Sequence, residues 1–155
     1  MSESFPTWIE QEDESVFLRE VCPRVYVGAR KSIGYRHWGL VIDLHGSPGH
    51  DSDKVVFWIF NDGEAFPDGS LSNILHHVLE CLNEESGDVL IACEMGRSRS
   101  ASCAYAMIRK IFKVSSEEAY SLIKTSTSFK AGTNLLTVDW PRTKTLNSAI
   151  EWVES

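Results

Sequence analysis

Residues 89–112 constrain the fold more than any other part of this 155-residue chain. Residues 89–92 form a short apolar run, which predicts a buried strand, and residues 101–112 are mostly apolar without Gly or Pro, which predicts a buried helix. The polar segment 93–100 joins them. A loop in this position directs main-chain N–H groups from a helix N-terminus, where the helix dipole favours a bound anion.

Four residues of this loop suit such an anion site. Cys93 directly follows the predicted strand, and the loop N–H groups together with the helix dipole favour its thiolate form. Arg99 offers a planar pair of donors that matches two oxygens of a phosphate. Gly96 permits a sharp bend, and Ser100 can donate a hydrogen bond to the sulfur. The alternative interpretation is a core cysteine beside a surface arginine.

The loop sequence CEMGRSRS, with the spacing Cys-x5-Arg-Ser, resembles the signature of the cysteine-dependent protein tyrosine phosphatases, and its form is most similar to the dual-specificity branch. The resemblance implies that Cys93 is the nucleophile, that Arg99 binds phosphate and that Ser100 eases departure of the thiolate. It also implies that the substrate is bound by Glu94, Met95, Gly96, Arg97, Ser98 and Arg99. A histidine usually precedes the cysteine in this family, whereas this chain has Ala92.

A second set of candidates follows the apolar run 55–60. Phosphoryl transfer through a cysteine needs an acid to protonate the leaving oxygen and later a base to activate water. The family supplies an aspartate from a loop upstream of the cysteine, and Asp62 lies 31 residues before Cys93. Asp68, which lies 25 residues before Cys93, and Glu64 are the alternatives. Asp62 beside Gly63 also fits a plain turn.

Predicted strands alternate with predicted helices, so we expect an α/β fold with a mostly parallel central sheet flanked by helices on both faces, similar to the protein tyrosine phosphatases. The anion loop is expected at the carboxyl end of a central strand. Ser70 is the expected N-cap of an amphipathic helix over residues 71–82, with His76 and His77 on its solvent-facing side. Residues 115–118 form a capping box, and Pro141 predicts the start of the last helix.

The sequence predicts neither a metal site nor a cofactor. His45, His50, Asp51 and Asp53 lie close together along the chain, but no regular spacing fixes their geometry around an ion. The cysteines also lack the spacing of metal ligands, and we expect them to be reduced thiols. They are Cys22, Cys81, Cys93 and Cys103.

Length and charge limit the remaining possibilities. We expect one phosphatase domain over residues 1–155, with the acidic residues 1–20 forming a strap packed on it. No apolar run reaches membrane-spanning length and the start does not resemble a signal peptide, so we expect a cytoplasmic protein without a membrane partner. The net charge of −7 argues against nucleic acid as a partner. Residues 94–130 carry seven Lys or Arg against three Glu, which would attract a phosphorylated ligand.

These observations predict a phosphomonoester hydrolase that acts on phosphotyrosine in proteins or peptides through a cysteinyl-phosphate, with phosphoserine and phosphothreonine as further candidate substrates. The alternative is a phosphate- or phosphopeptide-binding module with little or no turnover, and Ala92 keeps that alternative open. Sulfur or arsenate chemistry at a similar cysteine loop is the third hypothesis. The sequence makes no prediction of oligomeric state.

Overall fold

The computed structural model of the chain describes residues 7–8, 18–34, 36–46, 50–85, 87–94, 99–127 and 143–155. Within these residues six strands form one sheet in the order β1-β2-β3-β6-β4-β5. Four strands run parallel, and an antiparallel pair extends the sheet beside β3. The strands are β1 (Thr7–Trp8), β2 (Leu18–Cys22), β3 (Val25–Gly28), β4 (Trp38–Asp43), β5 (Ser52–Phe57) and β6 (Val89–Ala92). The predicted mostly parallel sheet is confirmed.

Strand β6 lies in the middle of the parallel part, between β3 and β4. Every residue of β6 and of β4 is buried, and strands covered on both faces give continuous apolar runs rather than alternating ones. Alternate residues of β6 serve different cores. Val89 and Ile91 belong to the larger core, whereas Leu90 and Ala92 belong to a smaller core on the other face. Cys93 continues this alternation and joins the larger core.

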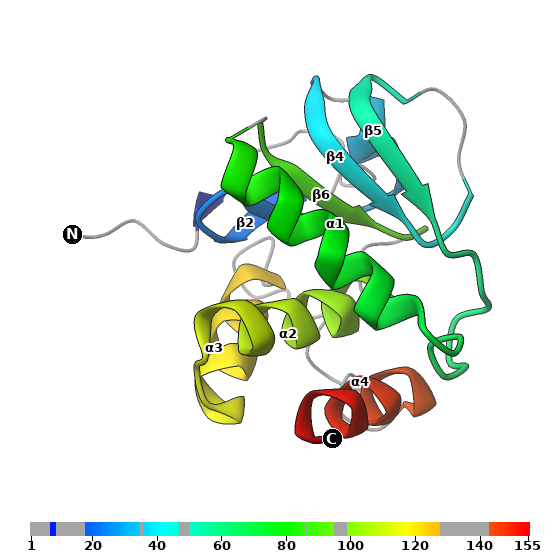
Figure 1. The fold of residues 1–155 in the computed structure, drawn as a ribbon, viewed down its shortest axis with the longest axis vertical. Helices are drawn as coiled ribbons and strands as arrows, with labels where there is room; N and C mark the ends of the chain where they lie inside the picture. The colour runs from blue at the N-terminus through cyan, green and yellow to red at the C-terminus, as the bar shows by residue number, and fades with distance from the viewer. Residues whose placement is uncertain are drawn as a thin grey trace.

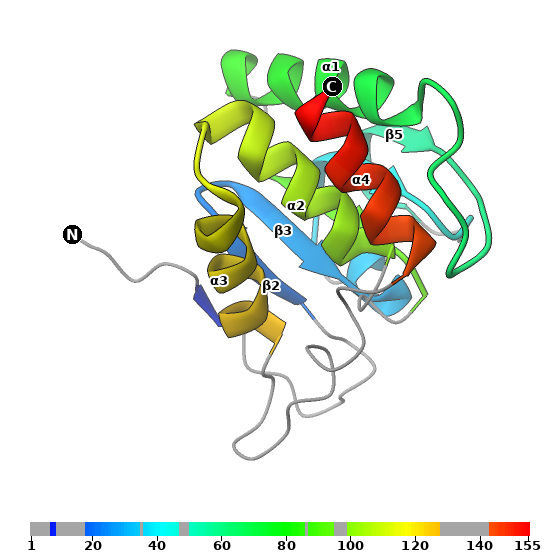
Figure 2. The same cartoon turned by 90° about the horizontal axis from the view of Figure 1, so that it is seen from below.

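Four α-helices of the described chain cover the larger core (Figure 1). They are α1 (Ser70–Glu84), α2 (Arg99–Phe112), α3 (Ser116–Thr127) and α4 (Lys144–Glu154). Figure 2 shows α2 lying between α3 and α4. The opposite face carries the 3₁₀ helix η1 (Arg30–Gly34), whose Ile33 packs in the smaller core with Trp38. Both faces of the sheet are therefore covered, but the second layer is one 3₁₀ helix rather than an α-helix.

Helix α2 is the most enclosed of these helices. Its residues from Arg99 through Ile108 are all buried, and four of the first six after Arg99 are Ala or Ser. Small side chains allow the helix axis to approach the sheet closely at native packing density. The helix begins at Arg99, two residues before the predicted start, so the arginine belongs to its first turn.

The helix ends agree with the sequence only in part. Gly69, with φ of 79°, occupies the N-cap position of α1, and Ser70 is the first helical residue, so the predicted cap is wrong. A glycine adopts this left-handed conformation without a Cβ clash. Ser115 caps α3, accepting from the main-chain N–H three residues later, as predicted. Thr143 caps α4, and the start predicted near Pro141 lies outside the described residues.

The four cysteines are buried and are thiols rather than disulfides. Burial raises the pKa of both Cys22 and Cys103, so both are protonated thiols at neutral pH. No helix in the described part of the chain is both long enough and apolar enough to cross a membrane.

Candidate active site

The predicted anion loop begins at the carboxyl end of β6, in the middle of the sheet. Cys93 follows the last residue of this strand, and its N–H donates to the carbonyl of Gly28 at 3.3 Å. Glu94 is exposed, and its carbonyl accepts from the N–H of Arg30 at 3.1 Å. The loop closes at Arg99, the first residue of α2. Four predicted substrate-binding residues lie outside the described residues: Met95, Gly96, Arg97 and Ser98.

Cys93 and Ser100 are hydrogen-bonded to each other. The thiol donates to the Ser100 hydroxyl at 3.3 Å, and the two residues are 3% and 0% exposed. A hydroxyl both donates and accepts, so the same pair can reverse when the sulfur is ionised, with Ser100 donating to the thiolate. The contact is the one that the predicted role of Ser100 requires.

Arg99 is a buried cation held by main-chain oxygens. The residue is only 8% exposed, and its Nη1 donates to the carbonyl of Phe60 at 2.7 Å and to that of Leu44 at 3.3 Å. Its Nε is buried and has no hydrogen-bond partner among the described residues. Burying a charge without a partner is costly. The free donor therefore matches the predicted binding of an oxyanion by Arg99.

The carbonyl of Leu44 is held in place by Asp43, the last residue of β4. The Asp43 carboxylate is fully buried and accepts from the N–H groups of His45 at 2.9 Å and Gly46 at 2.7 Å. The Nε2 of His50 donates to its other oxygen at 2.8 Å. Gly46 adopts a φ of 92°, which a residue with a Cβ rarely reaches. The carboxylate thereby fixes the turn that presents Leu44 to Arg99.

The candidate acids follow the second carbonyl that holds Arg99. Strand β5 ends at Phe57, three residues before the predicted end of the strand at residue 60. The carbonyl of Phe60 accepts a hydrogen bond from Arg99. Asp62 comes two residues later in a turn, where Gly63 has φ of 89°. Asp62 and the alternatives Glu64 and Asp68 are all exposed. The hydrogen bond at Phe60 holds the main chain two residues before Asp62 against the guanidinium.

The segment that carries these acids is docked on α4. Thr145 Oγ1 donates to the Glu64 carbonyl at 2.6 Å, and the N–H of Phe66 donates to Ser148 Oγ at 3.0 Å. The rings of Phe60 and Phe66 lie 4.9 Å apart, which adds an apolar contact inside the segment. Asp68 lines a groove of about 380 Å³ between this segment, the first turn of α1 and α4.

The residues considered as metal ligands are not brought together. His50 pairs with Asp43, while the two ring nitrogens of His37 bond to different carboxylates, Asp51 at 2.8 Å and Asp53 at 3.0 Å. These two bonds raise the pKa of His37. The opposed directions of the ring nitrogens leave no common point for an ion.

Solved structures provide the comparison, since no protein-family model and no curated protein matches the chain. Tk-PTP in its active form superposes with a TM-score of 0.70 and 18% identity, over 89% of this chain and 96% of that one. Human DUSP28 gives 0.66 and 15%, over 89% and 90%. The chain has the dual-specificity phosphatase fold. The human tyrosine phosphatase-like serine/threonine/tyrosine-interacting protein has it too, with 0.65 and 15% over 87% and 94%.

Within this dual-specificity phosphatase fold, the position before Cys93 is occupied by a small apolar residue. Ala92 is fully buried in the smaller core with Trp38 and Ile33, on the face of the sheet opposite to Cys93. A side chain at this position is enclosed by apolar groups. Apolar side chains therefore surround Ala92, at the position where a histidine usually precedes the cysteine.

Sequence reasoning missed three parts of the site. The carbonyls of Leu44 and Phe60 hold the arginine, and a main-chain oxygen leaves no mark in the sequence. Asp43 was detectable, because an aspartate at the end of the apolar run 39–44 is an unusual residue in a buried strand. Thr145 and Ser148 gave no signal, since they act from a helix some eighty residues further along the chain.

We predict that Asp43→Ala lowers the free energy of unfolding by about 2–4 kcal/mol, because it leaves two part-buried N–H groups and an imidazole without their buried acceptor. Denaturant unfolding monitored by circular dichroism measures the change. Asp51→Ala is the matched control: it removes an exposed aspartate that also binds a histidine, and it should cost less than about 1 kcal/mol. Equal effects of the two substitutions would contradict the role assigned to Asp43.

Proposed function

We propose that the protein hydrolyses phosphomonoesters, with phosphotyrosine in proteins or peptides as the main substrate and phosphoserine and phosphothreonine as additional ones. The observation that carries the proposal is the buried Arg99 guanidinium, whose Nε has no partner among the described residues. A cysteine follows the neighbouring strand and contacts a hydroxyl on the first turn of the same helix. The proposed nucleophile therefore follows β6 directly, and the proposed anion-binding donor begins the helix that comes after it.

In the first step the substrate phosphate binds to the loop N–H groups and to Arg99, which neutralise its charge. The Cys93 thiolate attacks phosphorus in line, so that an S–P bond forms as the bond from phosphorus to the ester oxygen breaks. Asp62 donates its proton to the departing oxygen, which leaves as an alcohol or phenol. Positioning and charge stabilisation supply most of the rate enhancement.

In the second step a water molecule attacks the cysteinyl-phosphate. Asp62, now ionised, accepts a proton from this water as the new P–O bond forms and the S–P bond breaks. The sulfur leaves as a thiolate, and Ser100 donates a hydrogen bond to it across the contact described above. Inorganic phosphate is released and Asp62 is protonated again, so no metal or cofactor enters this sequence.

The alternative function is a phosphate- or phosphopeptide-binding module with little turnover. Two observations favour it: Cys93 is only 3% exposed, and Ala92 gives the loop no imidazole. One human protein with a similar fold is named a tyrosine phosphatase-like serine/threonine/tyrosine-interacting protein, so this architecture is also found in a protein that is not named a phosphatase. Both functions use Arg99 in the same way, and turnover alone separates them.

We predict that wild-type protein hydrolyses phenyl phosphate and a phosphotyrosine peptide, and that Cys93→Ser abolishes turnover while retaining peptide binding. Arg99→Lys should lower kcat/KM by about 10²–10³-fold, because an ammonium cannot supply paired donors at fixed geometry. Arg109→Lys on the same helix is the matched control and should retain activity. Binding by the wild type without measurable turnover would replace the phosphatase with the binding module.

We predict that Asp62→Asn lowers kcat for phenyl phosphate by about 10²-fold and removes the loss of rate at high pH, because the asparagine cannot donate the proton. The reduction should be smaller for nitrophenyl phosphate, since a better leaving group needs less protonation. Asp68→Asn serves as the control and should leave both rates and the bell-shaped pH profile unchanged. The opposite pattern would transfer the acid role to Asp68.

A further inference from the structure

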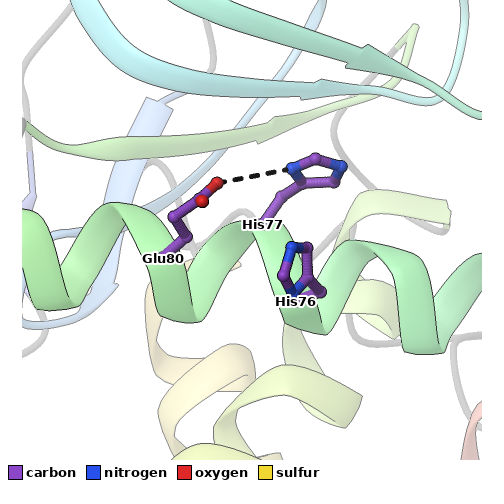
Figure 3. A group of neighbouring side chains, drawn as sticks. All are labelled: His76, His77 and Glu80. Atoms are coloured by element: carbon purple, nitrogen blue, oxygen red, sulfur yellow. Dashed lines mark ion pairs between the residues drawn. The ribbon is translucent and has the colours of Figure 1, made fainter.

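A cluster of three metal-binding side chains lies on α1, outside the catalytic machinery. His76, His77 and Glu80 each offer one ligand atom, and these three atoms lie within 4.8 Å of one another. Figure 3 shows His77 and Glu80 directed toward one another from successive turns of the helix, with the His76 ring beside them. The rings of the two histidines are 5.2 Å apart between centroids. Two imidazoles and a carboxylate are a common ligand set for zinc.

His77 is the least accessible member of the cluster. The sequence predicts a solvated side chain here, but the structure leaves the His77 side chain only 17% exposed. Its Nδ1 is buried without a hydrogen-bond partner among the described residues, and Glu80 Oε1 lies 4.0 Å from it. Burial, the Lys54 ammonium and His76 lower the pKa of His77, whereas Glu80 raises it. An unpartnered ring nitrogen facing a carboxylate is a feature that a cation bound between them would account for.

We propose that His76, His77 and Glu80 bind a divalent first-row transition metal, with Zn²⁺ as the ion of choice. Imidazole and carboxylate ligands suit this ion, and three protein ligands leave its fourth position for water. Zinc binds nitrogen and oxygen at about 2.0–2.2 Å, which sets ligand atoms of a tetrahedral site about 3.3 Å apart. The three ligand atoms lie within 4.8 Å of one another, so binding requires the exposed His76 and Glu80 side chains to rotate toward the ion.

Lys54 on β5 opposes the metal. Its Nζ lies 3.4 Å from Glu80 Oε1, with the two side chains 50% and 42% exposed. An ion pair between such exposed groups is weak, so zinc can displace the lysine from the carboxylate. The lysine gives the proposal a discriminating test, because removing it should strengthen binding without altering any ligand.

The site is distinct from the proposed catalytic centre. All three ligands come from the middle of α1, whereas Cys93, Arg99 and Ser100 come from the β6–α2 connection and its helix. Bound zinc would link neighbouring turns of α1 and stabilise the folded protein by mass action. The proposal does not depend on phosphatase activity, and its test needs no substrate.

The test is isothermal titration of ZnCl2 into the reference protein, the full chain carrying Cys93→Ser, which lacks the thiol of the proposed nucleophile. We expect zinc to bind with one-to-one stoichiometry. His77→Ala or Glu80→Gln should weaken this binding at least about tenfold, because loss of a residue that merely orients a metal ligand already weakens metal binding by that factor. His37→Ala is the matched control, because His37 also lies between carboxylates but offers no common point for an ion, and it should leave binding unchanged.

Lys54→Met provides a second measurement that touches no ligand, and we expect it to tighten zinc binding by about threefold. Zinc should also raise the unfolding temperature of the reference protein, and not that of His77→Ala. Absence of saturable binding in the reference, or binding that His77→Ala leaves unchanged, would overturn the proposal. Weaker binding in Lys54→Met would overturn it as well, because the lysine would then assist the ion.

Discussion

The site depends on a positive charge buried at the start of α2. Removing a guanidinium from water is expensive, and Arg99 recovers part of that free energy through two hydrogen bonds to main-chain carbonyls. Those carbonyls belong to Leu44, just after β4, and to Phe60, just after β5. Arg99 therefore connects the segments that follow β4 and β5 to α2, the helix that follows β6. The Nε that remains is the donor that an oxyanion would satisfy.

In the proposed mechanism this arrangement would link phosphate binding at Arg99 to proton transfer from Asp62. The carbonyl that binds Arg99 at Phe60 stands two residues before Asp62, and the same segment is fastened to α4 by Thr145 and Ser148. On the other side, Asp43 holds the turn that carries Leu44. The guanidinium thus has a fixed position before any ligand arrives, and preorganised donors of this kind stabilise charge without reorganisation during the reaction.

The sequence predicted much of the architecture and less of the site. Apolar runs located β4 and β6, and the loop spacing located Cys93, Arg99 and Ser100, because those signals are local. The acceptors of Arg99 were not predictable, since a carbonyl looks the same at every residue. The N-cap of α1 was wrong because Gly69 takes a left-handed conformation that a preference for serine at caps does not reveal. His77 was expected in solvent, but its side chain is only 17% exposed.

The most direct measurement of the central claim is a crystal structure of Cys93→Ser protein grown with inorganic phosphate. The account predicts a phosphate oxygen within about 3.2 Å of Arg99 Nε, with Nη1 still donating to the Leu44 and Phe60 carbonyls. It also predicts the serine hydroxyl at residue 93 facing phosphorus. A phosphate bound elsewhere, or an Arg99 Nε donating to a protein oxygen while phosphate is present, would contradict it.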